Sequence, residues 1–287
     1  MIEQKNNIFH LTTKNSSYVF QILQNNVIEH IYYGRRLVNP FMDIKALQTK
    51  ASSLNKYNNY IDSRSNLCLD LLPRELTTEG KGDYKTPSCT ILDTKTFNKT
   101  LDFKFIKYQE KNGIVRFSDT LPQAIGSETN CQNLIISLLD NTQDLELELI
   151  YTIFPEADVI TKRTILKNTG TNEIVITESA SSVLDFSSSA FTLKTFDGEK
   201  TITNGKTVFE TCSNYAASPL LVLEKNNGEC YYLNLIYSGA SKTTIEKTAS
   251  GLLHIVQGVN FSVNQLTLKK DESFEAPEAV LAYNPVS

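Results

Sequence analysis

The pattern of hydrophobic and polar positions along the chain consists mainly of short runs in which apolar residues alternate with polar ones. Between positions 145 and 154, apolar residues occupy positions 145, 147, 149, 151 and 153, while Glu146, Glu148 and Thr152 lie between them. A period of two places alternate side chains on opposite faces of an extended chain. This stretch therefore predicts a half-buried antiparallel strand.

Similar runs recur along the chain with turn-forming residues about every eight to twelve positions, a spacing typical of β-sandwiches. Asn168-Thr169-Gly170-Thr171-Asn172 separates two of them and predicts a hairpin turn. No amphipathic helical pattern of ten or more residues is found. The fold class is therefore predicted to be all-β, with two large antiparallel sheets packed face to face. The predicted strands are 8–11, 18–23, 27–33, 90–92, 101–108, 134–140, 145–154, 159–168, 173–178, 183–186, 191–194, 207–211, 220–223, 231–237, 241–247, 252–257 and 265–268.

The segment from Leu67 to Asp93 is the least regular part of this pattern. Three leucines alternate at positions 67, 69 and 71, Pro73 ends the alternation, and Gly80 and Gly82 allow the backbone to turn. Loops of this kind carry the binding or assembly residues of many β-scaffolds. No glycine-rich or serine-rich linker divides the 287 residues, so residues 1–287 are expected to form one domain.

The amino-acid composition limits the kinds of partner and the cellular compartment that we expect for this protein. The 28 basic residues are interspersed with 32 acidic ones, giving a net charge of −4, which argues against nucleic acid and an anionic membrane as partners. No apolar run of membrane-spanning length and no signal-peptide pattern is present, and we expect a cytoplasmic protein. The five cysteines are widely spaced without a CxxC pair, which predicts free thiols and neither a metal site nor a cofactor.

The residues also offer no self-contained catalytic motif. Acidic residues are plentiful but fall at outward strand positions, and the serine-rich stretch Ser179–Ser189 contains no GxSxG sequence. His10, His30 and His254 lie in predicted strands with apolar neighbours, which favours packed histidines. We find no positioned His and Glu pair of the kind that a sugar epimerase needs. The absence of tryptophan counts against an independent carbohydrate-binding module, because tryptophan is a favoured platform for sugar rings.

Several motifs occur in the order seen in one enzyme family. The chain resembles the N-terminal part of glycoside hydrolase family 36 α-galactosidases over nearly its whole length. The motifs that carry the resemblance are FHLTTKNSSYVFQI at 9–22, VIEHIYYGRRL at 27–37, LDLLPRELTTEGKGDYKTP at 69–87, DVITKRTILKNTG at 158–170, VLDFSSSAF at 183–191, LNLIYSGA at 233–240 and SFEAPEAVLAYN at 273–284.

This resemblance implies an antiparallel β-supersandwich similar to the galactose-mutarotase fold, followed in the family by a catalytic (β/α)₈ barrel. Both catalytic aspartates of the retaining mechanism lie in that barrel, so we assign no catalytic residue to this chain. The expected function is that of a noncatalytic N-terminal domain, or a truncated product, of an enzyme that hydrolyses terminal α-galactosides. It would support the barrel, the active-site entrance and a homo-oligomer. The alternative is a free-standing carbohydrate-binding or structural β-sandwich module.

The resemblance also assigns accessory positions. Family members place a tryptophan and an aspartate from two loops at the sugar subsite, where this chain has Phe196 and Ser53, with Asp62 as the nearest acid in the second loop. Serine lacks the two acceptor oxygens of a carboxylate, so these positions predict an altered subsite. Asp83, Tyr84 and Lys85 of the GKGDYKTP sequence are expected to contact the barrel or a neighbouring subunit.

Overall fold

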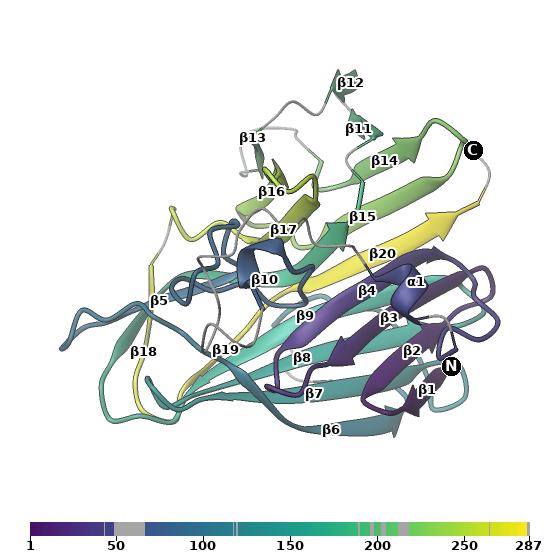
Figure 1. Cartoon of the computed structure of the whole chain (residues 1–287). Helices are drawn as coiled ribbons and strands as arrows, with labels where there is room; N and C mark the ends of the chain where they lie inside the picture. The colour runs from purple at the N-terminus through teal and green to yellow at the C-terminus, as the bar shows by residue number, and fades with distance from the viewer. Residues whose placement is uncertain are drawn as a thin grey trace.

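The computed structural model describes residues 1–42, 44–48, 67–116, 118, 120–188, 190–195, 198–201, 205–211, 218–263 and 265–285. The regular elements of this part of the chain are almost all β-strands, with one short α-helix and one short 3₁₀ helix (Figure 1). No helix within it is long and apolar enough to cross a membrane. The elements are β1 (Ile2–Lys5), β2 (Ile8–Thr12), β3 (Ser16–Ile22), β4 (Ile28–Arg35), α1 (Ile44–Leu47), η1 (Leu69–Leu71), β5 (Cys89–Asp93), β6 (Lys104–Asn112), β7 (Gln132–Asp140), β8 (Leu145–Phe154), β9 (Val159–Asn168), β10 (Ile174–Phe186), β11 (Phe191–Thr195), β12 (Gly198–Thr201), β13 (Gly205–Thr211), β14 (Leu221–Lys225), β15 (Cys230–Ile236), β16 (Ser241–Lys247), β17 (Leu253–Val259), β18 (Leu266–Leu268), β19 (Ser273–Glu275) and β20 (Glu278–Asn284).

These strands form three antiparallel sheets. The largest has ten strands in the order β12-β11-β14-β15-β20-β9-β8-β7-β6, with β19 beside β9. A four-stranded sheet has the order β1-β2-β3-β4, and a six-stranded sheet has the order β13-β16-β17-β10-β18, with β5 on the other edge of β10. The prediction of an all-β antiparallel fold is confirmed.

The predicted hairpin at residues 168–172 is wrong. Strand β9 belongs to the ten-stranded sheet and β10 to the six-stranded sheet, so the turn crosses between layers. Asn168 fixes this crossing, because its side-chain amide donates to the carbonyls of Asn172 at 2.8 Å and Leu268 at 3.0 Å, and its side-chain oxygen accepts from the Gly170 amide at 3.0 Å. A turn sequence specifies local backbone geometry and leaves the choice of sheet to the side chains around it.

The runs predicted at 173–178 and 183–186 are one thirteen-residue strand, β10. The serines between them are polar in sequence, yet Ser179, Ser181 and Ser182 are buried. Their stretch continues the pairing with β17, with a bulge between Ala180 and Ser182. Predicted and observed bounds agree for β8, β9 and β16.

One hydrophobic cluster runs between the layers and includes residues of all three sheets. The four-stranded sheet lies in front of β7, β8 and β9 in Figure 1, and its aromatic side chains pack onto them. Phe20 stacks on Phe9 with 5.0 Å between ring centroids and on Tyr151 of β8 at 5.3 Å. Burial of such rings contributes hydrophobic stabilisation to the contact between the two layers.

The segment from Pro73 to Ser88 completes the second layer by filling the space between the four-stranded and six-stranded sheets. The His30 amide of β4 donates to the Pro73 carbonyl at 3.0 Å, and the Ala180 amide of β10 donates to the Ser88 carbonyl at 2.7 Å. Glu29, the neighbour of His30 in β4, forms an isolated antiparallel bridge with Arg74. The segment therefore substitutes for a strand between β4 and β10.

A polar contact at the edge ties the layers together. Asp158, in the turn between β8 and β9, accepts hydrogen bonds from the Thr13 hydroxyl, from the Asn15 amide at 3.0 Å and from the Asn15 side chain at 2.7 Å. Its backbone adopts a left-handed φ of 60°, which aspartate tolerates better than most residues do. Asp158 therefore contributes in two ways: its side chain connects the two layers, and its backbone forms the turn.

We predict that Asp158→Ala lowers the free energy of unfolding by about 1–3 kcal/mol, because three hydrogen bonds to a carboxylate are lost. Asp271→Ala is the matched control, since Asp271 is exposed and has a similar φ of 65°. Urea denaturation of both variants checks the prediction. If both variants lose the same free energy of unfolding, the loss comes from placing alanine at a left-handed φ, and the hydrogen bonds of Asp158 to Thr13 and Asn15 contribute nothing to stability.

Candidate functional site

The segment that follows η1 forms a loop whose tip, at residues 79–81, is exposed. Gly80, Lys81 and Gly82 have left-handed φ angles of 90°, 58° and 78°, which turn the chain back sharply. A Cβ atom at Gly80 would lie 2.7 Å from Cγ2 of Thr100, so glycine is needed there for space as well as for φ. The loop then places Asp83, Tyr84 and Lys85 in succession.

These three side chains do not share one environment. Asp83 and Lys85 are buried, with exposed fractions of 6% and 3%, whereas Tyr84 is 68% exposed. Asp83 pairs with the Lys85 ammonium at 2.8 Å and with the Arg74 guanidinium at 3.2 Å. The Lys85 ammonium also donates to the Leu69 carbonyl at 2.5 Å. Asp83 and Lys85 therefore hold the loop together from within, and Tyr84 is the member of the trio that is available to a partner.

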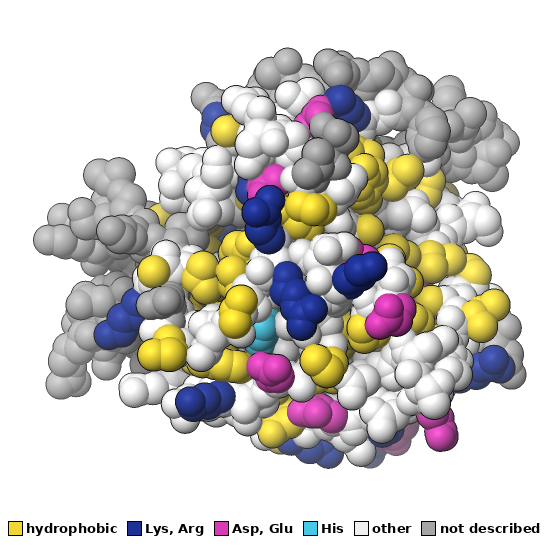
Figure 2. All heavy atoms as spheres, turned by 90° about the vertical axis from the view of Figure 1, so that its right-hand side faces the viewer, with side chains coloured by type: hydrophobic (Ala, Val, Ile, Leu, Met, Phe, Trp, Pro, Cys, Tyr) yellow, Lys and Arg dark blue, Asp and Glu magenta, His cyan; other side chains and the backbone are white. Residues whose placement is uncertain are grey.

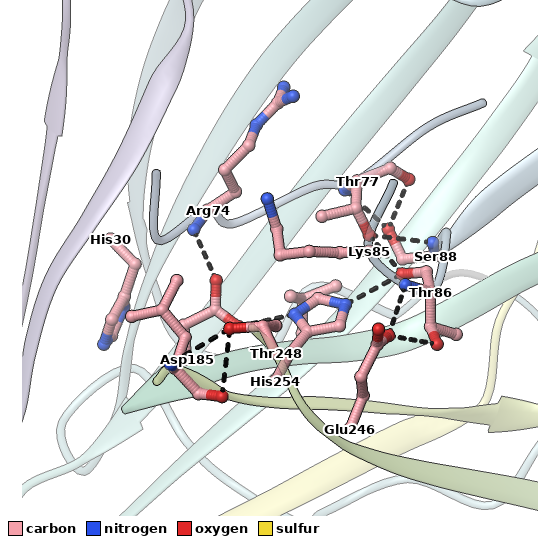
Figure 3. Close-up of polar contacts among 12 residues, drawn as sticks. His30, Arg74, Thr77, Lys85, Thr86, Ser88, Asp185, Glu246, Thr248 and His254 are labelled. Atoms are coloured by element: carbon pink, nitrogen blue, oxygen red, sulfur yellow. Dashed lines mark hydrogen bonds and ion pairs between the residues drawn. The ribbon is translucent and has the colours of Figure 1, made fainter. Parts of the chain in front are cut away.

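A second group of polar contacts attaches both limbs of the loop to the six-stranded sheet (Figure 3). Asp185 of β10 accepts from the Arg74 amide at 2.7 Å and from Nδ1 of His254 at 2.5 Å. Nε2 of His254 on β17 donates to the Thr86 carbonyl at 2.8 Å. Glu246, opposite His254 on β16, accepts from the Thr86 amide and hydroxyl, both at 2.7 Å. We call Asp185, His254 and Glu246 the loop clamp.

The loop clamp requires a charged histidine. Both ring nitrogens of His254 face acceptors, because Asp185 is a carboxylate and the Thr86 carbonyl has no proton to donate. Burial alone lowers the pKa of His254, but the Asp185 carboxylate outweighs this effect and raises the pKa above its usual range. The same pairing lowers the pKa of Asp185 against the opposing effect of its burial. His254 is therefore an imidazolium paired with a carboxylate.

Behind the loop, Glu75 lies in the centre of the core and is surrounded by donors. The hydroxyls of Tyr18 and Tyr151 donate to it at 2.7 Å, Nδ1 of His30 at 2.7 Å, and the Lys162 ammonium at 2.8 Å. Burial alone raises the pKa of Glu75, but Lys162 and His30 reverse this and lower the pKa to about 2. We call these five residues the Glu75 cluster.

A positioned His and Glu pair, expected to be absent, is therefore present as His30 and Glu75. Their side chains are 2% and 0% exposed, and the carboxylate is already occupied by the other donors of the cluster. General acid or base catalysis requires contact with a substrate or with water that reaches it. The pair is a buried structural contact, and we assign it no catalytic role.

Next to Tyr84 the surface is hollowed into an open recess of about 570 Å³. Its walls are residues 79–85, Pro87 and Lys206, so it combines an aromatic ring with charged groups of both signs. No group of three or more His, Cys, Asp or Glu side chains capable of holding a metal ion is found among the described residues. The recess is suited to contact with a partner surface.

The three predicted subsite positions, Ser53, Asp62 and Phe196, lie outside the residues that the structure describes. Sequence reasoning did not identify the polar residues inside the fold, chiefly Glu75, Lys162 and Asp185. A signal for them was present: Lys162 and Asp185 each interrupt an apolar stretch, in VITKRTIL and VLDF. A charged residue in a strand with apolar neighbours on both sides is a candidate for a buried ion pair.

Comparison with known proteins shows a consistent similarity. A family model described as the glycosyl hydrolase family 36 N-terminal domain matches residues 26–269. The bifunctional alpha-galactosidase/sucrose kinase AgaSK of Mediterraneibacter gnavus is 30% identical over 96% of this chain and 31% of its own length. Alpha-galactosidase 1 of Pediococcus pentosaceus is 25% identical over 98% of this chain and 40% of its own length.

Solved structures show the same similarity at the level of the fold. The galactosidase domain of AgaSK superposes with a TM-score of 0.91 at 28% identity, over 99% of this chain and 42% of that one. The alpha-galactosidase of Lactobacillus brevis gives a TM-score of 0.88 at 26% identity, over 96% of this chain and 39% of that one. The chain thus spans well under half the length of the relatives that it matches.

The loop clamp predicts a specific pH dependence. Because the pKa of His254 is raised on folding, its contribution to stability is complete below the unfolded-state value of about 6.5 and is lost as pH rises through the folded-state value. His254→Gln removes this charge, so the stability difference between wild type and variant is expected to narrow at alkaline pH. Urea denaturation of the wild type and of His254→Gln from pH 6 upward measures this difference in the free energy of unfolding. A difference that does not change with pH would contradict a charged His254.

Proposed function

The chain belongs to the glycosyl hydrolase family 36 N-terminal domains, and on this premise we propose that it is the noncatalytic N-terminal part of an α-galactosidase. The observation that carries the proposal is the match to the family model over residues 26–269, together with the superposition on the galactosidase domain of AgaSK. The substrates of the whole enzyme would be terminal α-galactosides. Its setting would be cytoplasmic carbohydrate metabolism, and the free, buried thiols of the four described cysteines fit a reducing compartment.

We further propose that residues 1–287 act as one domain that supports a following catalytic barrel. A single hydrophobic cluster connects all three sheets, which favours a unit that moves as one body. Strand β20 points toward the side of the molecule that Figure 2 presents, where hydrophobic side chains are interspersed with charged ones of both signs. Such a mixture is usual for contacts between domains of one chain. The barrel is expected to pack against this side.

The recess beside Tyr84 is the second proposed contact, either with the barrel or with a neighbouring subunit. The clamped loop presents the tyrosine ring on a rigid base, and exposed aromatic residues on rigid supports are favoured anchors of interfaces. Asp83 and Lys85 contribute indirectly, because they fix the backbone on both sides of Tyr84. Ser53, Asp62 and Phe196 remain the proposed accessory sugar contacts of the whole enzyme.

The proposed function predicts that the purified 287-residue chain does not hydrolyse a chromogenic α-galactoside. The physical reason is that a retaining glycosidase needs two carboxyl groups, and the family resemblance assigns both of them to a barrel that residues 1–287 do not include. Turnover that co-purifies with the chain and scales with its concentration would contradict this reading. Saturable binding of galactose or raffinose in calorimetry, without turnover, would instead favour the free-standing carbohydrate-binding module.

A second prediction concerns Tyr84. If its recess is a contact between subunits, Tyr84→Ala weakens self-association of the chain by about tenfold or more, the effect of losing an interface anchor. Sedimentation equilibrium gives the association constant. Ile125→Ala is the control, because Ile125 is 93% exposed on another loop. If the association constant is unchanged in both variants, the recess is not a contact between subunits, and it either contacts the barrel or faces solvent.

A further inference from the structure

A small cavity lies between the two layers, and Glu75, Tyr151 and Lys162 of the Glu75 cluster are among the residues that line it. Its volume is about 10 Å³, close to the space that one water molecule needs. Strands β8 and β9 form one wall, and β10 with residues near Glu75 forms the other. We propose that this cavity is a binding site for one ordered water molecule, held by the hydroxyls of Ser181 and Ser182.

The two serines have the properties of water ligands. Ser181 and Ser182 line the cavity, are 1% and 3% exposed, and among the described residues neither hydroxyl has a hydrogen-bond partner. A buried hydroxyl without a partner costs folding free energy. A water molecule between the two hydroxyls would satisfy both. Thr164 also lines the cavity, and its hydroxyl, which donates to the Ala180 carbonyl at 2.9 Å, retains the capacity to accept a third bond from the water.

The backbone around the cavity is shaped to place these hydroxyls. The pairing of β10 with β17 skips one residue between Ala180 and Ser182, so Ser181 is the extra residue of a bulge. Gly258 on β17 packs directly on this bulge, because a Cβ atom there would lie 2.7 Å from Cα of Ala180. From Ser182 to Phe186 the pairing of β10 with β17 is regular again. The bulge therefore lies at the point where two adjacent serines, Ser181 and Ser182, both line the cavity.

The surrounding charges select a neutral ligand. Lys162 directs its three N–H groups at Tyr18, Glu75 and the Val183 carbonyl, at 2.8, 2.8 and 2.6 Å. The charges of Lys162 and Glu75 therefore compensate each other. Arg163, the other basic lining residue, interacts with Glu278 and Glu275. A further ion in the cavity would be buried without a counter-charge of its own. Water is small, neutral and able to both donate and accept. It would also reduce the cost of burying the ion pair beside it.

The sign of a stability change distinguishes a hydrated cavity from a dry one. If water is bound, Ser182→Ala removes one of its ligands, and the folding equilibrium constant is expected to fall about fivefold, the effect of one hydrogen bond. If the cavity is dry, the same change deletes an unsatisfied hydroxyl and the constant stays the same or rises. Ser179→Ala is the matched control, because Ser179 lies on the same strand and is equally buried, and its hydroxyl is likewise without a partner among the described residues. Ser179 does not line the cavity.

Urea denaturation of the whole chain and of the two variants gives these constants. The proposal expects a loss for Ser182→Ala and none for Ser179→Ala. A second readout is transfer of magnetisation from water to the backbone amides of Ser181 and Ser182 in NMR, which a bound water produces even where both variants have similar stability. No transfer at these amides, together with an unchanged or more stable Ser182→Ala variant, would overturn the proposal.

Discussion

The rest of the structure depends on the hydrogen bonds and the ion pair that the buried Glu75 carboxylate forms. Its donors come from both layers: Tyr18 and His30 from the four-stranded sheet, and Tyr151 and Lys162 from the ten-stranded sheet. Lys162 continues the connection to the Val183 carbonyl of β10 at 2.6 Å. All three sheets therefore meet at one buried ion pair, which is costly to desolvate and strongly destabilising to break. Such a pair also favours one arrangement of the sheets over others, because only that arrangement satisfies every donor.

Glu75 belongs to the irregular segment that substitutes for a strand between β4 and β10, and this location connects the core to the proposed function. The same segment carries Arg74, which contacts Asp83 and Asp185 of the loop clamp, and it also carries the exposed ring of Tyr84. A chain of direct polar contacts therefore connects the buried ion pair with the loop that carries Tyr84. In the function that we propose, this part of the fold is a rigid support whose polar residues fix the position of a contact surface.

The sequence predicted those features that depend on local pattern. Strand β8 follows from alternation, because its odd-numbered positions from 145 to 153 are all buried. The crossing at Asn168 was missed, since turn chemistry does not reveal which sheet receives the next strand. The Glu75 cluster and the loop clamp were missed for a related reason: their partners are separated by 87 residues for Lys162 and Glu75 and by 69 for His254 and Asp185. Pattern analysis assigns isolated charges to the surface, and only the fold brings such charges together.

A double-mutant cycle on Glu75→Gln and Lys162→Met tests the role of this ion pair most directly. The quantity measured is the free energy of unfolding of the wild type, the two single variants and the double variant. Each single variant leaves a buried partner without its counter-charge, and the account predicts a loss of about 3–5 kcal/mol for each. The double variant is predicted to lose clearly less than the sum of the two, since neither charge remains. Small and strictly additive losses would contradict the claim that this ion pair holds the layers together.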